Sequence, residues 1–196
     1  MSVQGQLVLA SESPRRREFL VRAGLAFRVE SSGVDEEQAA PAGGTPADVA
    51  LQLAIVKARA VATRFPADVV LAADTVVGVG RELIGKPGDE ADARRIITRL
   101  QGTTQEVVTG LAVRCDSRGV NLSRTVTSVV RMRSMAADEV DAYVQSGRWR
   151  GKAGGYGIQD ADPIVELVRG SLTNVIGLPV DDVIEMLALA GISADG

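Results

Sequence analysis

The chain has 196 residues, of which 45% are hydrophobic and 24% are charged. This length and composition fit one compact domain with a substantial core, which we expect to span residues 1–196. The net charge is −3, from 22 Lys and Arg residues against 25 Asp and Glu residues. Nothing in that balance favours nucleic acid or an anionic membrane as a general partner.

The near absence of two residue types excludes several kinds of chemistry. The sequence has no histidine and one cysteine, Cys115. Ser-His-Asp triads, Cys-His pairs and imidazole acid–base catalysis are therefore excluded, as is a disulfide within the chain. A Cys/His zinc site is strongly disfavoured. Catalysis has to use carboxylates, Lys, Arg, hydroxyls or a hard metal bound by oxygen. Cys115 lies in an apolar segment, so we expect it to be a small core residue.

The sequence carries no signal for export or membrane insertion. Its first residues include a short apolar run without a preceding basic region, which is not typical of a signal peptide. No window approaches the apolar length that a membrane span requires. We therefore expect a cytoplasmic protein.

A strand followed by a basic helix opens the chain. The strand is expected at residues 7–10, and Ser13 and Pro14 are a favourable N-cap and first helical residue. The helix should end at Gly24. Its first turn carries Arg15, Arg16 and Arg17, although anions are favoured at that end of a helix. The turn is either a solvated basic surface or an anion site made by amides, serine hydroxyls and guanidinium groups.

A second strand and a long helix follow. The strand is expected at Phe27–Val29, and the acidic residues at 35–37 should lie in a loop as a solvated charge run. The helix is expected to begin after Thr45, with a start that resembles a capping box, and to end near Thr63. We expect its apolar stripe to contain Val49, Leu53, Val56 and Ala60.

Lys57 does not fit the pattern of this helix. Its neighbours three and four positions away are all apolar. Either its aliphatic stem lies along apolar surface while the ammonium reaches water, or the ammonium is held in a pocket for an anion.

The most apolar strand of the chain contains a carboxylate. Val69–Val79 is predicted to be a strand buried on both faces, and only Asp74 and Thr75 interrupt its apolar residues. An ionised carboxylate is costly in such a place unless a cation or several donors meet it. Asp74 therefore needs a partner elsewhere in the chain, unless the strand ends there and Asp74 caps a turn in water.

Alternating helices and strands are expected in the second half. A hairpin turn is expected at residues 80–82, and Lys86 precedes a proline that holds it extended. Asp89 should cap the next helix. Two long strands at residues 106–115 and 120–133 should form a hairpin.

The last third contains a glycine-rich segment between two helices. Ser134 is expected to open a helix that Gly147 closes. Residues 151–159 include four glycines that let backbone approach a ligand closely, although such runs also form plain turns. A late strand is expected at residues 164–168. A closing helix is expected at residues 179–190, with its inward side chains at Val183, Ile184 and Leu187.

Seven segments, in this order and spacing, resemble the motifs of the Maf family of nucleoside triphosphate pyrophosphatases. The resemblance covers the chain from residue 7 to about residue 187. The segments are LASESPRRREFL, the pair Asp35-Glu36, LAIVKARAV around Lys57, LAADTVV, IGKP, GKAGGYGIQ and NVIGLP.

The resemblance implies a single Maf-like domain with an elongated α/β fold. A mixed β-sheet flanked by helices would form two lobes with a central cleft, similar to the inosine triphosphatase fold. It also implies hydrolysis of a nucleoside triphosphate to the monophosphate and pyrophosphate, with Mg²⁺ or Mn²⁺ as cofactor. The triphosphate is the expected partner, nucleic acid and membranes are not, and a homodimer is allowed.

The family's functional positions fall on particular residues of this chain. Its proton-accepting aspartate matches Asp74, which with Glu36 is also expected to bind the metal; whether Asp74 acts mainly as base or as ligand stays open. The substrate-binding positions match Ser11, Arg15, Lys57, Thr75, Lys86 and Gln159. Among these, Arg15, Thr75 and Gln159 match the positions tied to base choice in the branch acting on dTTP and UTP.

Two departures from the family pattern leave the preferred base less fixed. The usual Leu-Ser-Gly-X-X-His segment reads LQGTTQ at residues 100–105, which removes any role for a histidine there, and Gly151 replaces a frequent aspartate. The alternatives are a pyrophosphatase for another base, such as 7-methyl-GTP or a modified purine triphosphate, and a nucleotide-binding regulator of septum formation and cell division.

Overall fold

We analysed a computed structural model of the protein, which describes residues 5–193. Within these residues seven strands form one mixed sheet in the order β2-β1-β3-β5-β6-β7, with β4 paired to β3. β1 is parallel to β2 and β3, and the other pairs are antiparallel. The strands are β1 Leu7–Leu9, β2 Phe27–Val29, β3 Val69–Val79, β4 Glu82–Ile84, β5 Thr104–Cys115, β6 Val120–Met132 and β7 Val165–Arg169.

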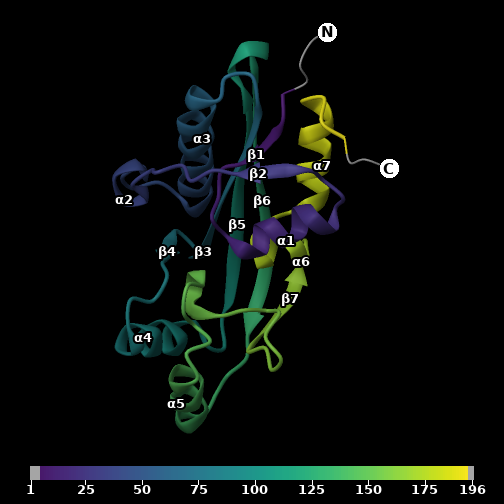
Figure 1. The fold of residues 1–196 in the computed structure, drawn as a ribbon. Helices are drawn as coiled ribbons and strands as arrows, with labels where there is room; N and C mark the ends of the chain where they lie inside the picture. The colour runs from purple at the N-terminus through teal and green to yellow at the C-terminus, as the bar shows by residue number, and fades with distance from the viewer. Residues whose placement is uncertain (1–4, 194–196) are drawn as a thin grey trace.

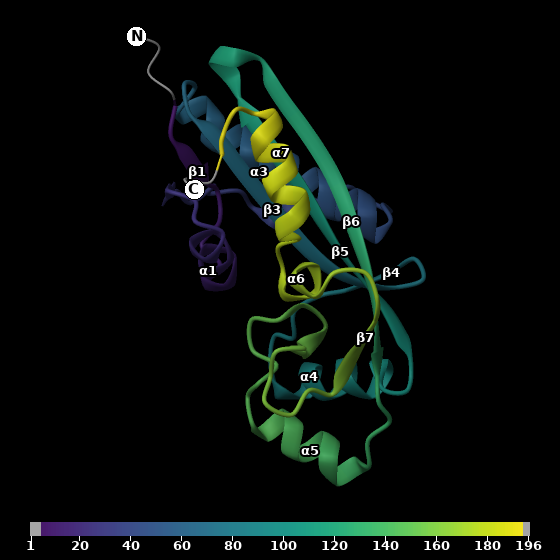
Figure 2. The ribbon, with the colours of Figure 1, turned by 90° about the vertical axis from the view of Figure 1, so that its right-hand side faces the viewer.

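Helices flank this sheet, and the molecule is elongated and has two lobes (Figure 1, Figure 2). The helices are α1 Pro14–Arg22, α2 Glu36–Ala39, α3 Pro46–Arg64, α4 Glu90–Leu100, α5 Ala137–Gln145, α6 Leu172–Ile176 and α7 Val180–Leu189, with short 3-10 turns η1 Asp116–Arg118 and η2 Ala153–Gly155. The expected α/β fold with two lobes is confirmed. Within residues 5–193, no helix has the length and apolarity needed to cross a membrane.

The first lobe is built on the alternation of side chains along β3. Val70 and Ala72 pack against α3 on one face of the sheet. Val69, Leu71 and Ala73 pack with residues of α1 and α7 on the other face. Because successive side chains of a strand point to opposite faces, Asp74 continues the row that faces α3.

The second lobe has a core of its own. Residues of α4, α5, η2 and β7 pack against the far ends of the long strands, with Ile97, Tyr143 and Trp149 among the buried side chains. Figure 2 shows that β5 and β6 run from the first lobe into the second. The two lobes therefore share one sheet.

Several expected elements form as predicted. The strand at Phe27–Val29 has the expected bounds, and Thr45 and Asp48 form the capping box of α3. β5 and β6 form the long hairpin, and Cys115 is buried in the core. Asp89 caps α4 by accepting from the Asp92 amide.

Other expectations were wrong. Residues 36–39 form the short helix α2 rather than a loop, because the Asp35 side chain accepts from two amides and caps it. The helix expected to open at Ser134 begins at Ala137, with Glu139 accepting from the Ala136 amide. Helix α6 was not foreseen, because five residues are too few for a periodic pattern.

The buried faces of two helices also differ from expectation. In α3 the buried positions continue from Leu53 to Lys57 and Val61, whereas Val56 and Ala60 are half-buried at the side. Lys57 lies on the inner face of the helix despite its charge, which is why the apolar pattern does not include it. In α7, Met186 is buried instead of Ile184, which is 43% exposed.

Gly110 of β5 lies opposite Asp74 of β3, at a point where α3 packs closely on the sheet. A Cβ at Gly110 would lie 2.2 Å from the carbonyl oxygen of Ala50 in α3. We therefore predict that Gly110→Ala lowers the free energy of unfolding by about 1–3 kcal/mol, because overpacking forces backbone apart. Urea denaturation measures the effect. At Gly88 a Cβ meets none of the described residues within 4 Å, so Gly88→Ala is the control. Equal stability of the two variants would contradict the close packing.

Candidate active site

A gap along one edge of β3 opens the cleft between the lobes. On this edge β1 pairs with β3 at Val69–Leu71 and β4 pairs at Val77–Val79, while β5 occupies the opposite edge throughout. Among the described residues, no strand pairs with this edge of β3 between those two segments. A cavity of about 540 Å³ lies here and is lined from both lobes, including Asp74 and Thr75.

Asp74 finds its partner in Lys57 of α3. Lys57 Nζ lies 2.5 Å from Asp74 Oδ1 and 2.7 Å from Glu36 Oε1. Asp74 is 7% exposed and Lys57 is 6% exposed. The strand continues through Asp74, so the alternative in which Asp74 caps a turn in water is wrong. The alternative in which Lys57 reaches into water is also wrong, because its ammonium is buried between two carboxylates.

The charge of Lys57 also acts on Glu36, the more exposed of its two partners. Desolvation would raise the pKa of Glu36, but the hydrogen bond and charge of Lys57, with the charges of Lys86 and Arg16, lower it below its ordinary value. Glu36 is therefore ionised at neutral pH. Asp74 Oδ2 and Glu36 Oε2 accept no hydrogen bond from residues 5–193, so each carboxylate keeps one oxygen available to a ligand.

Thr75 points to the opposite face of β3, where it meets Arg16 of α1. The guanidinium of Arg16 donates to two backbone carbonyls, from Nε to Gly177 at 2.9 Å and from Nη1 to Ala73 at 2.7 Å. It also donates to two hydroxyls, from Nη1 to Ser11 Oγ and from Nη2 to Thr75 Oγ1, both at 3.1 Å. Ala73 lies in the gap of β3, so the guanidinium satisfies a carbonyl that a neighbouring strand would otherwise pair. Burial lowers the pKa of Arg16, and the charge of Asp74 opposes this effect.

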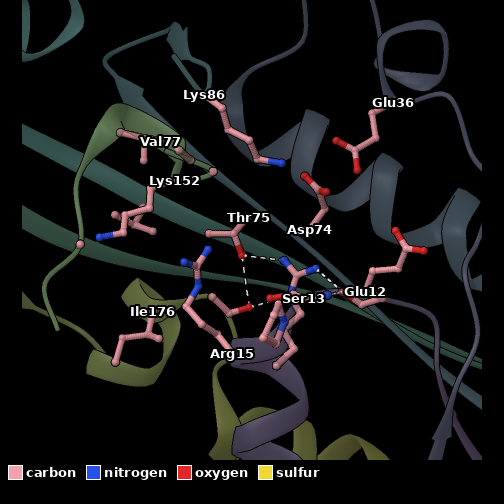
Figure 3. A pocket seen from close by; sticks show the side chains of 18 of the residues that line it. Glu12, Ser13, Arg15, Glu36, Asp74, Thr75, Val77, Lys86, Lys152 and Ile176 are labelled. Atoms are coloured by element: carbon pink, nitrogen blue, oxygen red, sulfur yellow. Dashed lines mark hydrogen bonds between the residues drawn. The ribbon is translucent and has the colours of Figure 1, made fainter. Parts of the chain in front are cut away.

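Other cations point into the cleft without such partners. Within the described part of the chain, the side chains of Arg15 and Lys86 make no hydrogen bond or ion pair. Figure 3 shows Lys86 pointing toward Asp74 and Glu36 from the opposite wall, and Arg15 rising from the start of α1. These two side chains are free to meet an anion that enters the cleft.

The glycine-rich segment forms the wall of the cavity that belongs to the second lobe. Gly157, Ile158 and Gln159 line the cavity, and Gln159 is exposed. Lys152 at the start of the segment forms an ion pair with Asp160 at its end, at 2.6 Å. The segment is therefore a closed loop rather than an open turn.

The structure brings every residue singled out from the sequence into this one cavity. They are Ser11, Arg15, Glu36, Lys57, Asp74, Thr75, Lys86 and Gln159. Their individual roles remain predictions. Six basic and three acidic side chains of the described chain line the cavity, so the lining carries net positive charge.

Sequence reasoning missed Arg16 as an individual residue. The three consecutive arginines form one basic turn in the sequence, but only Arg16 lies four positions before Leu20, which is fully buried. Residues four apart share a helix face, so this spacing was the available signal. The lining residues Arg150, Lys152 and Val175 carried no comparable signal.

We predict that Arg16→Met lowers the free energy of unfolding by about 1–3 kcal/mol, because the carbonyls of Ala73 and Gly177 lose their donor. Thermal or urea denaturation measures the loss. Arg17→Met is the matched control, since Arg17 is exposed and its side chain makes no hydrogen bond within residues 5–193. A change there should stay within about 0.5 kcal/mol. If both variants lose the same amount, the guanidinium of Arg16 does not support the edge of β3.

The chain is similar to known proteins over nearly its whole length. The family model described as Maf-like protein matches residues 6–190. Curated proteins named dTTP/UTP pyrophosphatase are similar over nearly the whole chain. That of Anaeromyxobacter dehalogenans (strain 2CP-1) is 45% identical over 95% of this chain and 94% of its own. That of Geobacter sulfurreducens is 43% identical over 96% of this chain and 98% of its own.

A solved structure is similar at a lower level. The Ham1 protein of Staphylococcus aureus matches with a TM-score of 0.45 and 15% identity, covering 96% of this chain and 91% of that one. A similarity this low says nothing about the site. The match of the family model over nearly the whole chain, with relatives above 40% identity, shows that this chain belongs to the Maf-like protein family.

Proposed function

We propose that this protein hydrolyses dTTP and UTP to the nucleoside monophosphate and pyrophosphate. The observation that carries the proposal is the single cleft in which Lys57 bridges two carboxylates while further cations face the same space. The chain is also 42–46% identical to proteins named dTTP/UTP pyrophosphatase. A positively charged cleft suits a triphosphate, and carboxylates beside it suit the activation of water.

The phosphates would bind along the cationic side of the cleft. Arg15 and Lys86 project into it without partners among residues 5–193, and the amides at the start of α1 line it with Ser11 and Ser13. Helix N-termini and guanidinium groups both favour phosphate oxygens. Cleavage at the α-phosphorus makes pyrophosphate the leaving group, and these cations would stabilise the charge that develops on it.

Asp74 would act on the attacking water. Its Oδ1 is fixed by Lys57 at 2.5 Å, while Oδ2 accepts no hydrogen bond from the described residues. A carboxylate held in this way can accept the proton that water releases on attack, or bind a metal. Lys57 would keep the carboxylate oriented and compensate its charge.

The donor set fits a divalent cation that binds together with the substrate. Asp74 and Glu36 each offer one free carboxylate oxygen to the cavity, and such oxygens are preferred ligands of Mg²⁺ and Mn²⁺. Residues 5–193 contain no group of three or more His, Cys, Asp or Glu residues that could hold a metal. Phosphate and water oxygens would therefore complete the shell. When bound, the ion would supply positive charge next to the phosphates.

Gln159 and Thr75 would contribute to base recognition in different ways. Gln159 is exposed in the cleft, and within residues 5–193 its amide makes no hydrogen bond, so its donor and acceptor suit the imide edge of uracil or thymine. The Thr75 hydroxyl is engaged by Arg16 and Thr109. We therefore infer that Thr75 affects base choice through the shape of the wall rather than through a hydrogen bond of its own.

A panel of nucleoside triphosphates, scored by pyrophosphate release, tests the proposal. We expect dTTP and UTP to be the preferred substrates. In Asp74→Asn, kcat should fall by a factor of at least about 100, because water loses its proton acceptor or metal ligand. The asparagine oxygen still accepts from Lys57, so the circular dichroism spectrum should be retained. Asp181→Asn, an exposed change away from the cavity, is the control.

Three outcomes would count against this proposal. Full activity of Asp74→Asn would remove the assigned catalytic residue. Preference for 7-methyl-GTP or a modified purine triphosphate would replace the substrate. Tight nucleotide binding with negligible turnover would indicate a regulator rather than an enzyme.

Metal binding provides a separate prediction. We expect Mn²⁺, followed by electron paramagnetic resonance, to bind weakly to the protein alone and at least about tenfold more tightly with a non-hydrolysable UTP analogue, because phosphates complete its coordination. Glu36→Gln should weaken this binding by about tenfold. Glu37→Gln is the matched control on the neighbouring exposed residue. Unchanged Mn²⁺ affinity in Glu36→Gln would exclude Glu36 as a ligand.

A homodimer and a cytoplasmic location also remain predictions.

A further inference from the structure

We propose that the ion pair of Lys152 and Asp160 is a positioning device for base recognition, which fixes the segment that carries Gln159 at the wall of the cleft. The inference rests on the proposed function, because that function assigns Gln159 to the base. It adds two residues to which the proposed mechanism gives no role.

The first half of this loop is anchored to the second lobe. The Gly154 amide donates to the Gly85 carbonyl at 3.0 Å, and the buried Tyr143 hydroxyl donates to the Gly155 carbonyl at 3.0 Å. These two bonds join η2 to the segment before Lys86 and to α5. The backbone up to Gly155 is therefore held by its surroundings.

The second half, which carries Gln159, has fewer hydrogen bonds, although Ile158 packs against the core of the second lobe. Within residues 5–193, Ile158 and Gln159 make no hydrogen bond to other parts of the chain. A turn bond from the Asp160 amide to the Gly157 carbonyl, at 3.3 Å, and the ion pair at 2.6 Å are what close the loop. The ion pair is therefore the main polar restraint on the backbone that carries Gln159, next to the packing of Ile158 on the core of the second lobe.

The burial and packing of the pair suit this role. The side chains of Lys152 and Asp160 are 14% and 12% exposed. A Cβ at Gly157 would lie 2.7 Å from both Lys152 Nζ and Asp160 Oδ1, so the pair packs directly on this backbone. Asp160 Oδ2 is buried and has no hydrogen-bond partner among the described residues. Lys152 is thus the cation on which the Asp160 carboxylate depends.

The direction of Lys152 separates this role from phosphate binding. Figure 3 shows its ammonium pointing away from Asp74 and Glu36, whereas that of Lys86 points toward them. With its ammonium held by Asp160, Lys152 acts on the substrate through the loop rather than by direct contact.

Steady-state kinetics of Asp160→Asn tests the proposal. The change keeps the shape of the side chain and removes its charge. We expect the KM for UTP to rise by about tenfold and kcat to change by less than about twofold, because base contacts act on binding. Selectivity for UTP over CTP should fall by about tenfold. Lys152→Gln, which neutralises the other partner, should reproduce these changes. Asp116→Asn, which breaks the Arg114–Asp116 pair of the β5–β6 hairpin, should leave selectivity unchanged.

A double-mutant cycle with Gln159 distinguishes positioning from general destabilisation. In Gln159→Ala the base contact is already lost, so adding Asp160→Asn should cause no further loss of selectivity. If the two losses multiply, or if Asp160→Asn lowers kcat/KM for all triphosphates equally, the pair does not act through Gln159.

Inhibition by pyrophosphate distinguishes the loop from the phosphate site. We expect the inhibition constant of pyrophosphate to be unchanged in Asp160→Asn and in Lys152→Gln. A weaker inhibition confined to Lys152→Gln would identify a phosphate ligand and overturn the proposal. A wild-type protein that hydrolyses neither UTP nor dTTP would overturn both proposals, whereas an active wild type with an unaffected Asp160→Asn variant would overturn only this one.

Discussion

The contact between the Lys57 ammonium and the Asp74 carboxylate is the constraint on which the rest of the site depends. An ionised carboxylate in the middle of a buried strand is costly without a partner, and here the partner is a cation, so removing Lys57 would leave a buried charge. The cation comes from the inner face of α3, so α3 must lie close to β3 and β5 at this point. Gly110, opposite Asp74, allows that approach because it has no side chain to separate helix and sheet. The close packing of α3 on the sheet and the contact of Lys57 with the carboxylates therefore depend on each other.

The interrupted edge of β3 explains why the cleft lies where it does. β1 ends early and β4 begins late along the same edge, so a stretch of backbone that a longer neighbour would cover faces the cavity. Arg16 satisfies the exposed Ala73 carbonyl there and links it to Gly177, between α6 and α7. The guanidinium thus has a structural function, and the adjacent Arg15 stays free for a ligand. Two neighbouring arginines of one helical turn have different surroundings because they lie on different faces of the helix.

The two lobes contribute different chemistry to the cleft. The first lobe provides the carboxylates, Lys57 and the start of α1, while the second provides Lys86 and the loop that carries Gln159. A triphosphate spanning the cleft would place its phosphates against the first lobe and Lys86, and its base against the loop. Activity and base choice could then vary separately.

The sequence indicated the order of the strands and of the longer helices, but not α2 or α6. It also indicated the capping of α3 and α4 and the need of Asp74 for a partner, because these depend on local periodicity and on the cost of an isolated buried charge. The motif resemblance predicted that the eight site residues belong to one site. Only the tertiary structure decided that Lys57 is the partner of Asp74, that Arg16 supports the edge of β3, and that Asp160 holds Lys152. Each of these contacts joins residues whose meeting depends on how helices and loops pack against the sheet, and spacing along the chain does not specify that packing.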